Sequence, residues 1–495
     1  MNKSLAGVSI RRYIYRPMHT PFFPALRARL APMGRRLKPL RQQSLPRLEE
    51  LFGSFLPVGL LSQAQEGLNS RDRIYGVRRT FWAFLYQVLN PHCPCREVVR
   101  QIQAFFCLHH PGRRVDAGTS AYCQARARLP LETLQRLRQA AASRVQSAAA
   151  ARQPCWHGLH PKIIDGTTVS LPDTPHNQRA YPQSSSQKPG CGFPLLKLVG
   201  IFSLSSGALL DYAKGNKHQH EMVLLNKLLG LFKPNDLALA DRGFSSYVLM
   251  ALLLLRGTAS LLRLHPARST DLRQGRRLGK NDRLCAWQKP PAKPRYLPQR
   301  LWKLVPGQLP VRLLRVTLQV PGFRPRSVTL VTTLVDPKRY PAQDVAWLYV
   351  RRWRVELWFR DIKTTMGMEH LSCLAPAMAH KELEMFFIAY NLIRALASQA
   401  LQAHQAPLDR MSFKGTVDAC RQYGLAIAQA RSKIKQRRLV LDLLEVIAAD
   451  QVPQRPGRRE PRALKRRHKN FPLLTASRDK YQEIRHRNHY RKIVP

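Results

Sequence analysis

Apolar side chains recur at spacings of three and four residues in the first part of the chain, and this period predicts amphipathic helices. The clearest groups run from Leu51 to Leu56 and from Phe81 to Leu89. We therefore predict an independent helical domain over residues 49–150. Its later part is a basic helix, on which Arg126 would either contact DNA or remain solvated.

From residue 162 the pattern changes to short, β-branched apolar runs that end at a glycine or an acid, which predicts strands. The two runs that matter most are Ile163–Val169 and Asp236–Asp241, and residues 197–212 between them have the pattern of a hairpin. Helical patterns alternate with these strands. The expected fold class is therefore α/β, a mixed sheet with helices on both faces.

Residues 264–335 interrupt this alternation. The segment is rich in Lys, Arg and Pro, has only Asp271 and Asp282 as acids, and ends in two segments of alternating apolar residues. We predict a β-rich basic insertion whose last strand would rejoin the main sheet. A long amphipathic helix over about residues 342–366 and an apolar helix over residues 381–403 follow it.

Charge is the strongest compositional signal. The 495 residues include 82 Lys and Arg against 30 Asp and Glu, a formal net charge of +52. A surface of this charge binds phosphate backbones, so nucleic acid is the expected partner, and a protein that merely has a high isoelectric point is the alternative. Nine cysteines without regular spacing suit a reducing compartment. No apolar run approaches the roughly 20 residues of a membrane span, so we expect a cytoplasmic, nucleoid-associated protein without a membrane partner.

These changes of pattern divide the chain into four predicted parts. They are a basic flexible arm (1–48), the helical domain (49–150), the main α/β domain with its insertion (151–400), and a helical and basic carboxyl-terminal region (401–495). The arm and the end of the last region are rich in Arg and Pro, a composition that opposes packing into a core. We expect the basic insertion and the tail to hold a DNA backbone.

Because acids are so few, those at strand ends are the first candidates for chemistry. Asp165 ends the first apolar strand and Asp241 ends the later one. If the two strands are neighbours, both carboxylates emerge at one edge of the sheet. The third candidate is Glu356, on the long amphipathic helix.

At about 100° per residue, four polar residues of that helix fall within an arc of roughly 60°. They are Tyr349, Arg352, Glu356 and Lys363. An adjacent apolar stripe would pack the helix on the sheet: Leu348, Val355, Phe359 and Ile362. The polar face then lies at the margin of the core, where a substrate can reach it. Taken alone, the same four residues also suit an ion-pair network.

Three converging carboxylates repel one another unless cations lie between them. Hard cations prefer oxygen ligands, and two ions roughly 4 Å apart activate an attacking oxygen and stabilise the leaving oxygen in phosphodiester cleavage. We therefore predict that Asp165, Asp241 and Glu356 bind two Mg²⁺ ions, for which Mn²⁺ can substitute. Arg352 and Lys363 would hold backbone phosphates.

Three motifs carry a family resemblance: Asp165-Gly-Thr, Ala240-Asp-Arg-Gly-Phe and Tyr349-x2-Arg352-x3-Glu356-x6-Lys363. Together they resemble the motifs of insertion-element-four-type DDE transposases, bacterial enzymes with a ribonuclease H-like catalytic core. The last motif is the most specific, because it fixes four residue types at three gaps on one helix. The resemblance covers about residues 49–400.

The resemblance implies a role for each matching position. Asp165, Asp241 and Glu356 would be the metal-binding catalytic triad. Three residues of the helix motif would contact transposon-end phosphates near the cleaved strand: Tyr349, Arg352 and Lys363.

The family's β-rich insertion matches residues 264–335 of this chain. In relatives that use a hairpin intermediate, an aromatic side chain of the insertion stacks on a flipped base. Trp287 and Trp302 are the candidates here. Their spacing does not choose between them, and an ordinary packing role stays open for both.

The expected function is that of a DNA transposase. Metal-dependent cleavage at the element ends exposes a 3′-hydroxyl, which attacks the other strand or target DNA. The partners would be double-stranded DNA of the ends and the target, and a second copy of the chain, because two ends must be held together. Two alternatives remain open: a structure-directed nuclease of the same fold, and a non-catalytic DNA-binding remnant of a mobile element.

Overall fold

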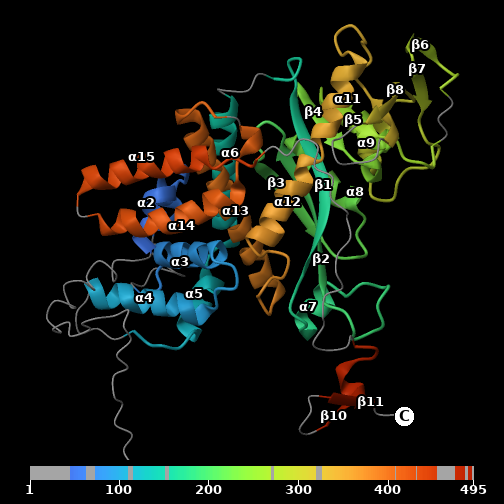
Figure 1. The fold of residues 1–495 in the computed structure, drawn as a ribbon. Helices are drawn as coiled ribbons and strands as arrows, with labels where there is room; N and C mark the ends of the chain where they lie inside the picture. Colours follow the sequence, from blue (N-terminus) through green and yellow to red (C-terminus); the bar gives the residue numbers. More distant parts are fainter. Residues whose placement is uncertain are drawn as a thin grey trace, which may run out of the picture.

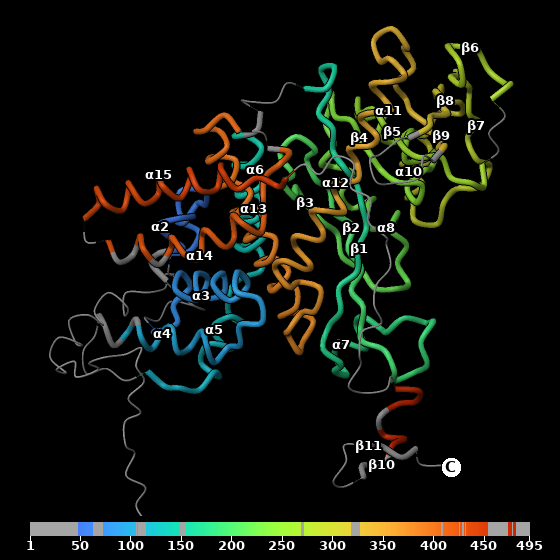
Figure 2. The backbone as a smooth tube through the Cα atoms, in the orientation of Figure 1, coloured from blue at the N-terminus to red at the C-terminus, as the bar shows by residue number. Residues whose placement is uncertain are grey.

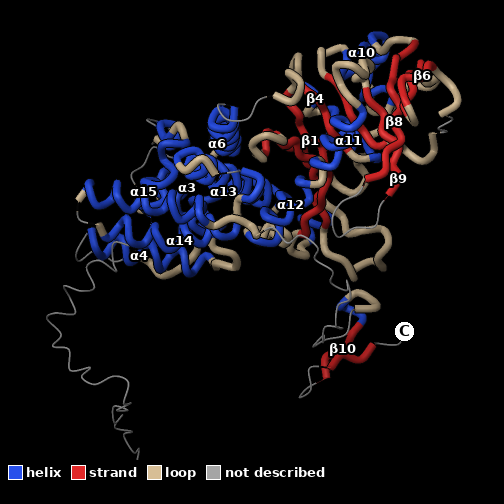
Figure 3. The backbone as a smooth tube through the Cα atoms, turned by 45° about the horizontal axis from the view of Figure 1, so that its top comes forward, coloured by secondary structure: helices blue, strands red, loops and turns tan. Residues whose placement is uncertain are grey.

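The computed structural model describes residues 45–62, 73–109, 115–150, 155–268, 272–318, 326–406, 408–430, 432–453, 474–484 and 489–492. The arm predicted over residues 1–48 lies almost wholly outside these ranges, and so does most of the basic tail. Most described elements form two bodies, one of helices and one built on a large sheet, and a separate hairpin of β10 (Tyr481–Ile484) and β11 (His489–Lys492) lies near the carboxyl terminus (Figure 1). Figure 3 separates them by secondary structure.

The second body is centred on a nine-stranded sheet with the order β3-β2-β1-β4-β5-β9-β8-β7-β6. Its strands are β1 (His160–Ser170), β2 (Leu195–Ser203), β3 (Leu209–Gly215), β4 (Asp236–Ala240), β5 (Ala259–Arg263), β6 (Arg276–Gly279), β7 (Asp282–Gln288), β8 (Gln308–Leu318) and β9 (Arg326–Thr332). β1 is antiparallel to β2 and parallel to β4, and β4 is parallel to β5. The prediction of a mixed α/β sheet is confirmed.

Residues 264–335 extend this sheet. β9 pairs antiparallel with β5, so the last strand of the segment rejoins the main sheet as predicted. A buried ion pair holds β7 to β8: Arg312 donates from Nε and Nη2 to the carboxylate oxygens of Asp282 at 2.9 and 2.6 Å. Asp282, one of the two acids of this basic segment, therefore has a structural role.

Both faces of the sheet are covered. The described helices of this body are α7 (Pro175–Ala180), α8 (Glu221–Asn226), α9 (Tyr247–Leu254), α10 (Gln299–Leu304), α11 (Ala342–Arg351) and α12 (Arg354–Arg360). Successive residues of a strand point to opposite faces, and Ile163 and Ile164 belong to different buried clusters. Phe359 of α12 lies in the first cluster and Leu249 of α9 in the second. Burial on both faces explains why these strands are continuous apolar runs.

The helical body combines helices that precede the sheet in the sequence with helices that follow it (Figure 2). Its helices are α2 (Leu45–Phe52), α3 (Val77–Leu89), α4 (Cys95–His109), α5 (Ser120–Arg128), α6 (Leu131–Ala150), α13 (Pro376–Ala403), α14 (Phe413–Gln429) and α15 (Lys433–Ala449). α13 packs along α6 and also against α3 and α15. Leu85, Leu134, Phe387 and Leu443 are fully buried in one cluster. The amino-terminal helices are therefore not an independent domain, because carboxyl-terminal helices complete their core.

α13 is the longest of the described helices, with 28 residues. It is buried around most of its circumference, since it lies inside the helical body and also reaches α12 and the sheet (Figure 1). Within the described part of the chain, no helix combines the length and hydropathy needed to cross a membrane.

Candidate active site

The pairing of β1 with β4 brings the two aspartates together. The parallel register sets Ile164 opposite Ala240, so the next residues along the two strands are Asp165 and Asp241. Neighbouring strands lie about 4.8 Å apart. The prediction that the two carboxylate-bearing strands are neighbours is confirmed.

Asp165 lies in a partly buried position, and its carboxylate accepts a hydrogen bond from the N–H of Gly166 at 2.9 Å. Burial raises the pKa of Asp165 to about 6, against the opposing effect of the Arg352 guanidinium. The negative charges of Asp241 and Glu356 raise this pKa further. The charges of the other two candidate carboxylates therefore both act on Asp165.

Gly166, in the Asp-Gly-Thr motif, has a steric reason to be glycine. A Cβ at this position would lie 2.4 Å from Oε1 of Glu221, which begins α8. The absent side chain lets the Glu221 carboxylate pack against β1 directly beside Asp165. Glu221 is thus a fourth carboxylate near the site, on the opposite face of the strand from Asp165.

Asp241 also has a local structural role. It is the N-cap of the short 3-10 turn Arg242–Phe244, and its Oδ1 accepts from the N–H of Gly243 at 2.8 Å. The Asp-Arg-Gly motif therefore turns the chain sharply at the end of β4. This turn fixes the Asp241 side chain at the edge of the sheet, partly open to solvent.

The long helix predicted over residues 342–366 is broken twice. Between α11 and α12, the N–H groups of Arg352 and Trp353 donate to carbonyls only three residues earlier. After α12 comes a π-helical turn, Asp361–Thr365, in which the N–H of Met366 donates to the carbonyl of Asp361. Such turns frequently occur at functional sites. The prediction of one continuous helix is wrong.

The four polar residues of the motif differ in how deeply their side chains are buried. Tyr349 and Arg352 are buried, with the guanidinium 5.7 Å from the centre of the ring. Glu356 is open to solvent, its side chain 65 % exposed, and its Oε1 lies 3.8 Å from Nη2 of Arg352. Lys363 lies half-buried within the π-helical turn. The predicted apolar stripe is confirmed, because all four of its members are buried: Leu348, Val355, Phe359 and Ile362.

The structure adds Arg263, which sequence reasoning missed. Ala240 of β4 pairs with Leu262 of β5, so Arg263 follows in register beside Asp241. Burial raises the pKa of Tyr349, and the charges of Arg352 and Arg263 oppose that shift. A cation at the end of an apolar strand was visible in the sequence, but only the β4–β5 pairing places it at the site.

Arg126 does not lie on a DNA-facing surface. It is buried in the helical body, where Nη1 donates to Oε1 of Gln87 at 3.1 Å. Its guanidinium also lies over the rings of Phe84 and Tyr122, at 4.9 and 5.1 Å from their centres. The prediction of a DNA contact is wrong for this residue, since its side chain is used in packing.

The two candidate tryptophans both lie in the basic segment, half-buried against the second cluster. Arg268 lies 4.3 Å from the ring centre of Trp287 on β7. The ammonium of Lys289 lies 4.1 Å from the ring centre of Trp302 on α10. Each ring already has a cationic neighbour, and this geometry does not choose between them.

The donor set at the sheet edge fits a hard divalent cation, because all its candidate ligands are carboxylate oxygens. Among the described residues, no three His, Cys, Asp or Glu side chains are yet gathered closely enough to hold an ion. The exposed Glu356 side chain is the group with the freedom to complete the set. Binding of a cation would relieve the repulsion that raises the pKa of Asp165.

Comparison with known proteins decides the family. Residues 158–392 match the family model of the transposase DDE domain. The chain is 27% identical over 427 residues to the transposase InsG of insertion sequence element IS4 from Escherichia coli K12, covering 85% of this chain and 93% of that protein. The chain belongs to the insertion-element-four-type DDE transposases. The resemblance of its motifs to this family is confirmed, and its function is DNA transposition.

Two further relatives of this transposase are also transposases. A putative transposase, InsZ of the same organism, is 33% identical over 142 residues, which cover 28% of this chain and 46% of that protein. A piggyBac transposase, solved in a synaptic complex with hairpin DNA, matches with a TM-score of 0.41 and 10% identity over 84% of this chain and 86% of that chain. That TM-score is too low to define the fold. As a DDE transposase, the protein depends on divalent metal.

Proposed function

We propose that this transposase cleaves DNA at the ends of its own element and joins the exposed 3′-hydroxyl to target DNA, with Asp165, Asp241 and Glu356 as the catalytic triad. The observation that carries this assignment is the β1–β4 register, which sets the two aspartates side by side. Glu356 complements them because its charge acts on Asp165. Double-stranded DNA of the element ends and of the target is the substrate.

We further infer a ribonuclease H-like core. The strand order β3-β2-β1-β4-β5 supports it, with three antiparallel strands followed by two parallel ones. In an open sheet of this kind, side chains at the ends of adjacent parallel strands meet at one edge. The segment with β6–β9 then lies between the second and third acids of the triad, on the far edge of the same sheet.

The three carboxylates would hold two Mg²⁺ ions, or Mn²⁺ in their place. Bound there, the metal supplies charge stabilisation for the attacking and leaving oxygens of the phosphodiester. The chain's own contribution is to fix the ligands. Gly166 and Gly243 donate backbone hydrogen bonds that orient Asp165 and Asp241. Arg352 lies close to Glu356 and limits where that side chain can turn.

Cationic and aromatic groups around the triad are placed to position the DNA strand. Nε of Arg352 is buried and has no hydrogen-bond partner among the described residues, so a phosphate contact would have to come from the terminal nitrogens of the guanidinium. Arg263 follows β5 in register with Asp241. The charges of both Arg263 and Arg352 act on Tyr349. Lys363 extends the row of cations along the π-helical turn. Guanidinium groups suit phosphates because they donate two parallel hydrogen bonds.

Two further assignments belong to this proposal. Trp287 or Trp302 would stack on a flipped base if the reaction passes through a hairpin. A homodimer would hold the two element ends together, with the helical body contacting the ends. The protein would then act in the bacterial cytoplasm, on the nucleoid.

Joining of DNA is the test that separates a transposase from the two alternatives. We expect the purified protein, with Mg²⁺, to cut a duplex that carries the terminal repeat of its element and to join that end to plasmid DNA. Sequencing of the junctions should show one defined end. Cleavage without any joining would favour a structure-directed nuclease. Binding without cleavage would favour a non-catalytic remnant.

The raised pKa of Asp165 predicts a pH dependence of metal binding. A carboxyl group with a pKa of about 6 holds a proton below that pH, and a cation has to displace it. We expect the affinity for Mn²⁺ to fall as the pH decreases from 7 through 6, with proton release on binding. Calorimetric titration in two buffers of different ionisation enthalpy measures both effects. Asp165→Asn should remove the proton release, and an unchanged release in that variant would contradict the assignment.

A further inference from the structure

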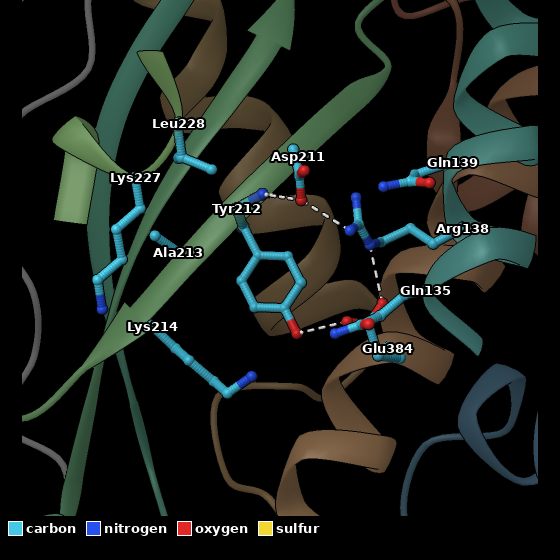
Figure 4. A pocket seen from close by; sticks show the side chains of 10 residues that line it. All are labelled: Gln135, Arg138, Gln139, Asp211, Tyr212, Ala213, Lys214, Lys227, Leu228 and Glu384. Carbon is cyan, nitrogen blue, oxygen red and sulfur yellow. Dashed lines mark hydrogen bonds and ion pairs between the residues drawn. The ribbon is translucent and has the colours of Figure 1, made fainter. Parts of the chain in front are cut away.

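A second concave surface lies away from the triad, between α6 and the β3 edge of the sheet. It consists of two adjoining cavities of about 460 and 540 Å³, which share Gln139 and Asp211 in their walls. We call this surface the α6 groove. Figure 4 shows the first cavity, with side chains of α6 on one side and Lys214 and Lys227 on the other.

The α6 wall of the groove is polar and uncharged along most of its length. Gln135, Gln139, Ser143, Gln146 and Ser147 line it, at spacings that place them on one face of the helix. Gln139, Ser143 and Ser147 are exposed. This wall therefore presents amide and hydroxyl groups to whatever occupies the groove.

The opposite wall carries three lysines: Lys214, Lys227 and Lys233. None of them has a carboxylate within ion-pair distance among the residues that the structure describes. Burial lowers the pKa of Lys214, and the neighbouring charges of Arg138 and Lys227 lower it further, while Glu384 opposes them. The charge of Lys227 thus acts on Lys214, and an anion between these two ammonium groups would relieve their repulsion.

The acids in the groove form ion pairs with other cations, while the charges of Glu384 and Asp211 also act on Lys214 from a longer distance. Arg138 contacts Asp211 at 2.7 Å and Glu384 at 2.8 Å. Lys162 contacts Asp236 at 2.6 Å. With these acids paired, the lining has more positive than negative charge.

The groove is separate from the triad. His160 and Asp236, at the amino-terminal ends of the parallel strands β1 and β4, line its second cavity. Asp241 follows the other end of β4. DNA held in the groove is therefore not the segment being cleaved at the carboxylates.

We propose that the α6 groove binds the phosphate backbone of the element-end duplex at positions away from the cleaved bond. This inference rests on the proposed function. Lysine ammonium groups bind phosphates, and Gln side-chain amides donate further hydrogen bonds to the DNA backbone that carry no sequence information. Tyr212, an aromatic side chain of the lining, is buried and donates to Glu384, so it offers no anchor for a protein partner. We assign the groove to element-end DNA because α6 belongs to the helical body, and the proposed function has this body contact the element ends.

The test compares two duplexes and two triple variants. The long duplex extends well into the element, and the short one contains only the base pairs around the cut. The groove variant is Lys214→Gln with Lys227→Gln and Lys233→Gln. The control is Arg179→Gln with Lys188→Gln and Lys338→Gln, which removes the same charge from exposed positions of the sheet body. Affinity for each duplex is measured over a range of salt concentrations.

We expect the groove variant to bind the long duplex with a log–log salt slope less steep by about 2 to 3, since each lost phosphate contact removes roughly 0.9. Its binding and cleavage of the short duplex should equal those of the unaltered protein, and the control should keep the full slope. Backbone footprinting should show protection lost inside the element only in the groove variant.

An unchanged slope in the groove variant, or an equal change in the control, overturns the proposal. Weaker capture of target DNA with normal binding of the long duplex overturns it too and assigns the groove to target DNA. The double variant Lys227→Gln with Lys233→Gln, at two exposed positions, repeats the test if substitution of the half-buried Lys214 disturbs folding. Failure of the unaltered protein to cut or join element ends would instead reject the proposed function, while the salt slopes still test the groove.

Discussion

Replacement of Asp241 by Asn should lower the rate of metal-dependent cleavage of an element-end duplex by roughly a thousandfold or more, because the metal stabilises the reacting oxygens by several kcal/mol. The side-chain oxygen of Asn still accepts the hydrogen bond from Gly243, so the turn after β4 is kept. The variant therefore removes the charge and leaves the local fold. Single-turnover cleavage with a labelled duplex measures the rate.

Binding of the same duplex in a mobility-shift assay should not change in Asp241→Asn. Asp173→Asn is the matched control, since Asp173 is an exposed acid whose carboxylate accepts only a hydrogen bond from Gln178 among the described contacts. That control should cleave at the unaltered rate. Cleavage by Asp241→Asn at a rate similar to the control would remove Asp241 from the triad and with it the assignment of the site.

The second large effect concerns the joint between the two bodies. Glu384 of α13 is 1 % exposed and accepts from Nε of Arg138 of α6 at 2.8 Å and from the hydroxyl of Tyr212 of β3 at 2.9 Å. Arg138 also donates to the carbonyl of Leu210 at 3.2 Å. One carboxylate thus joins two helices and the edge of the sheet. Figure 4 shows this network within the groove lining.

Glu384→Ala should lower the free energy of unfolding by about 3–5 kcal/mol, because it leaves a buried guanidinium without its main partner. Urea denaturation followed by circular dichroism measures the change. Glu445→Ala, at an exposed acid on α15, is the control and should stay within about 0.5 kcal/mol of the unaltered protein. A double variant, Arg138→Met with Glu384→Leu, should recover part of the loss, since it removes the buried guanidinium but leaves Asp211 and the Tyr212 hydroxyl without these partners. Equal stability of Glu384→Ala and the control would show that this network does not hold the bodies together.

The local sequence predicted the sheet well, for a definite reason. The residues around Ile163 and Leu239 are buried on both faces, so each segment is a short apolar run followed by an acid, although β1 itself continues past Asp165 to Ser170. The same signal led to Asp165 and Asp241. Their motif glycines, Gly166 and Gly243, mark places where the backbone packs closely against another group or turns sharply.

The long motif helix was predicted less well. Its residue types were sufficient to recognise the family, but a constant 100° per residue assumes an unbroken helix. The tight turn at Arg352 and the π-helical turn at Asp361–Thr365 change the rotation between motif residues. Whether Tyr349 is buried and Glu356 exposed depends on what packs around these breaks, which periodicity does not encode.

The sequence by itself determined the mixed α/β class, the candidates Asp165 and Asp241 and the membership of the DDE transposases, because these depend on short runs and fixed spacings, but Asp165 lies within β1 and not at its end. Only the tertiary structure decided which strands are neighbours, and so placed Arg263 beside Asp241 and buried Arg126 inside the helical body. It also decided that α13 and α15 complete the core begun by α3 and α6. An amphipathic helix specifies only that its apolar face must be covered, and the covering partner can come from any part of the chain.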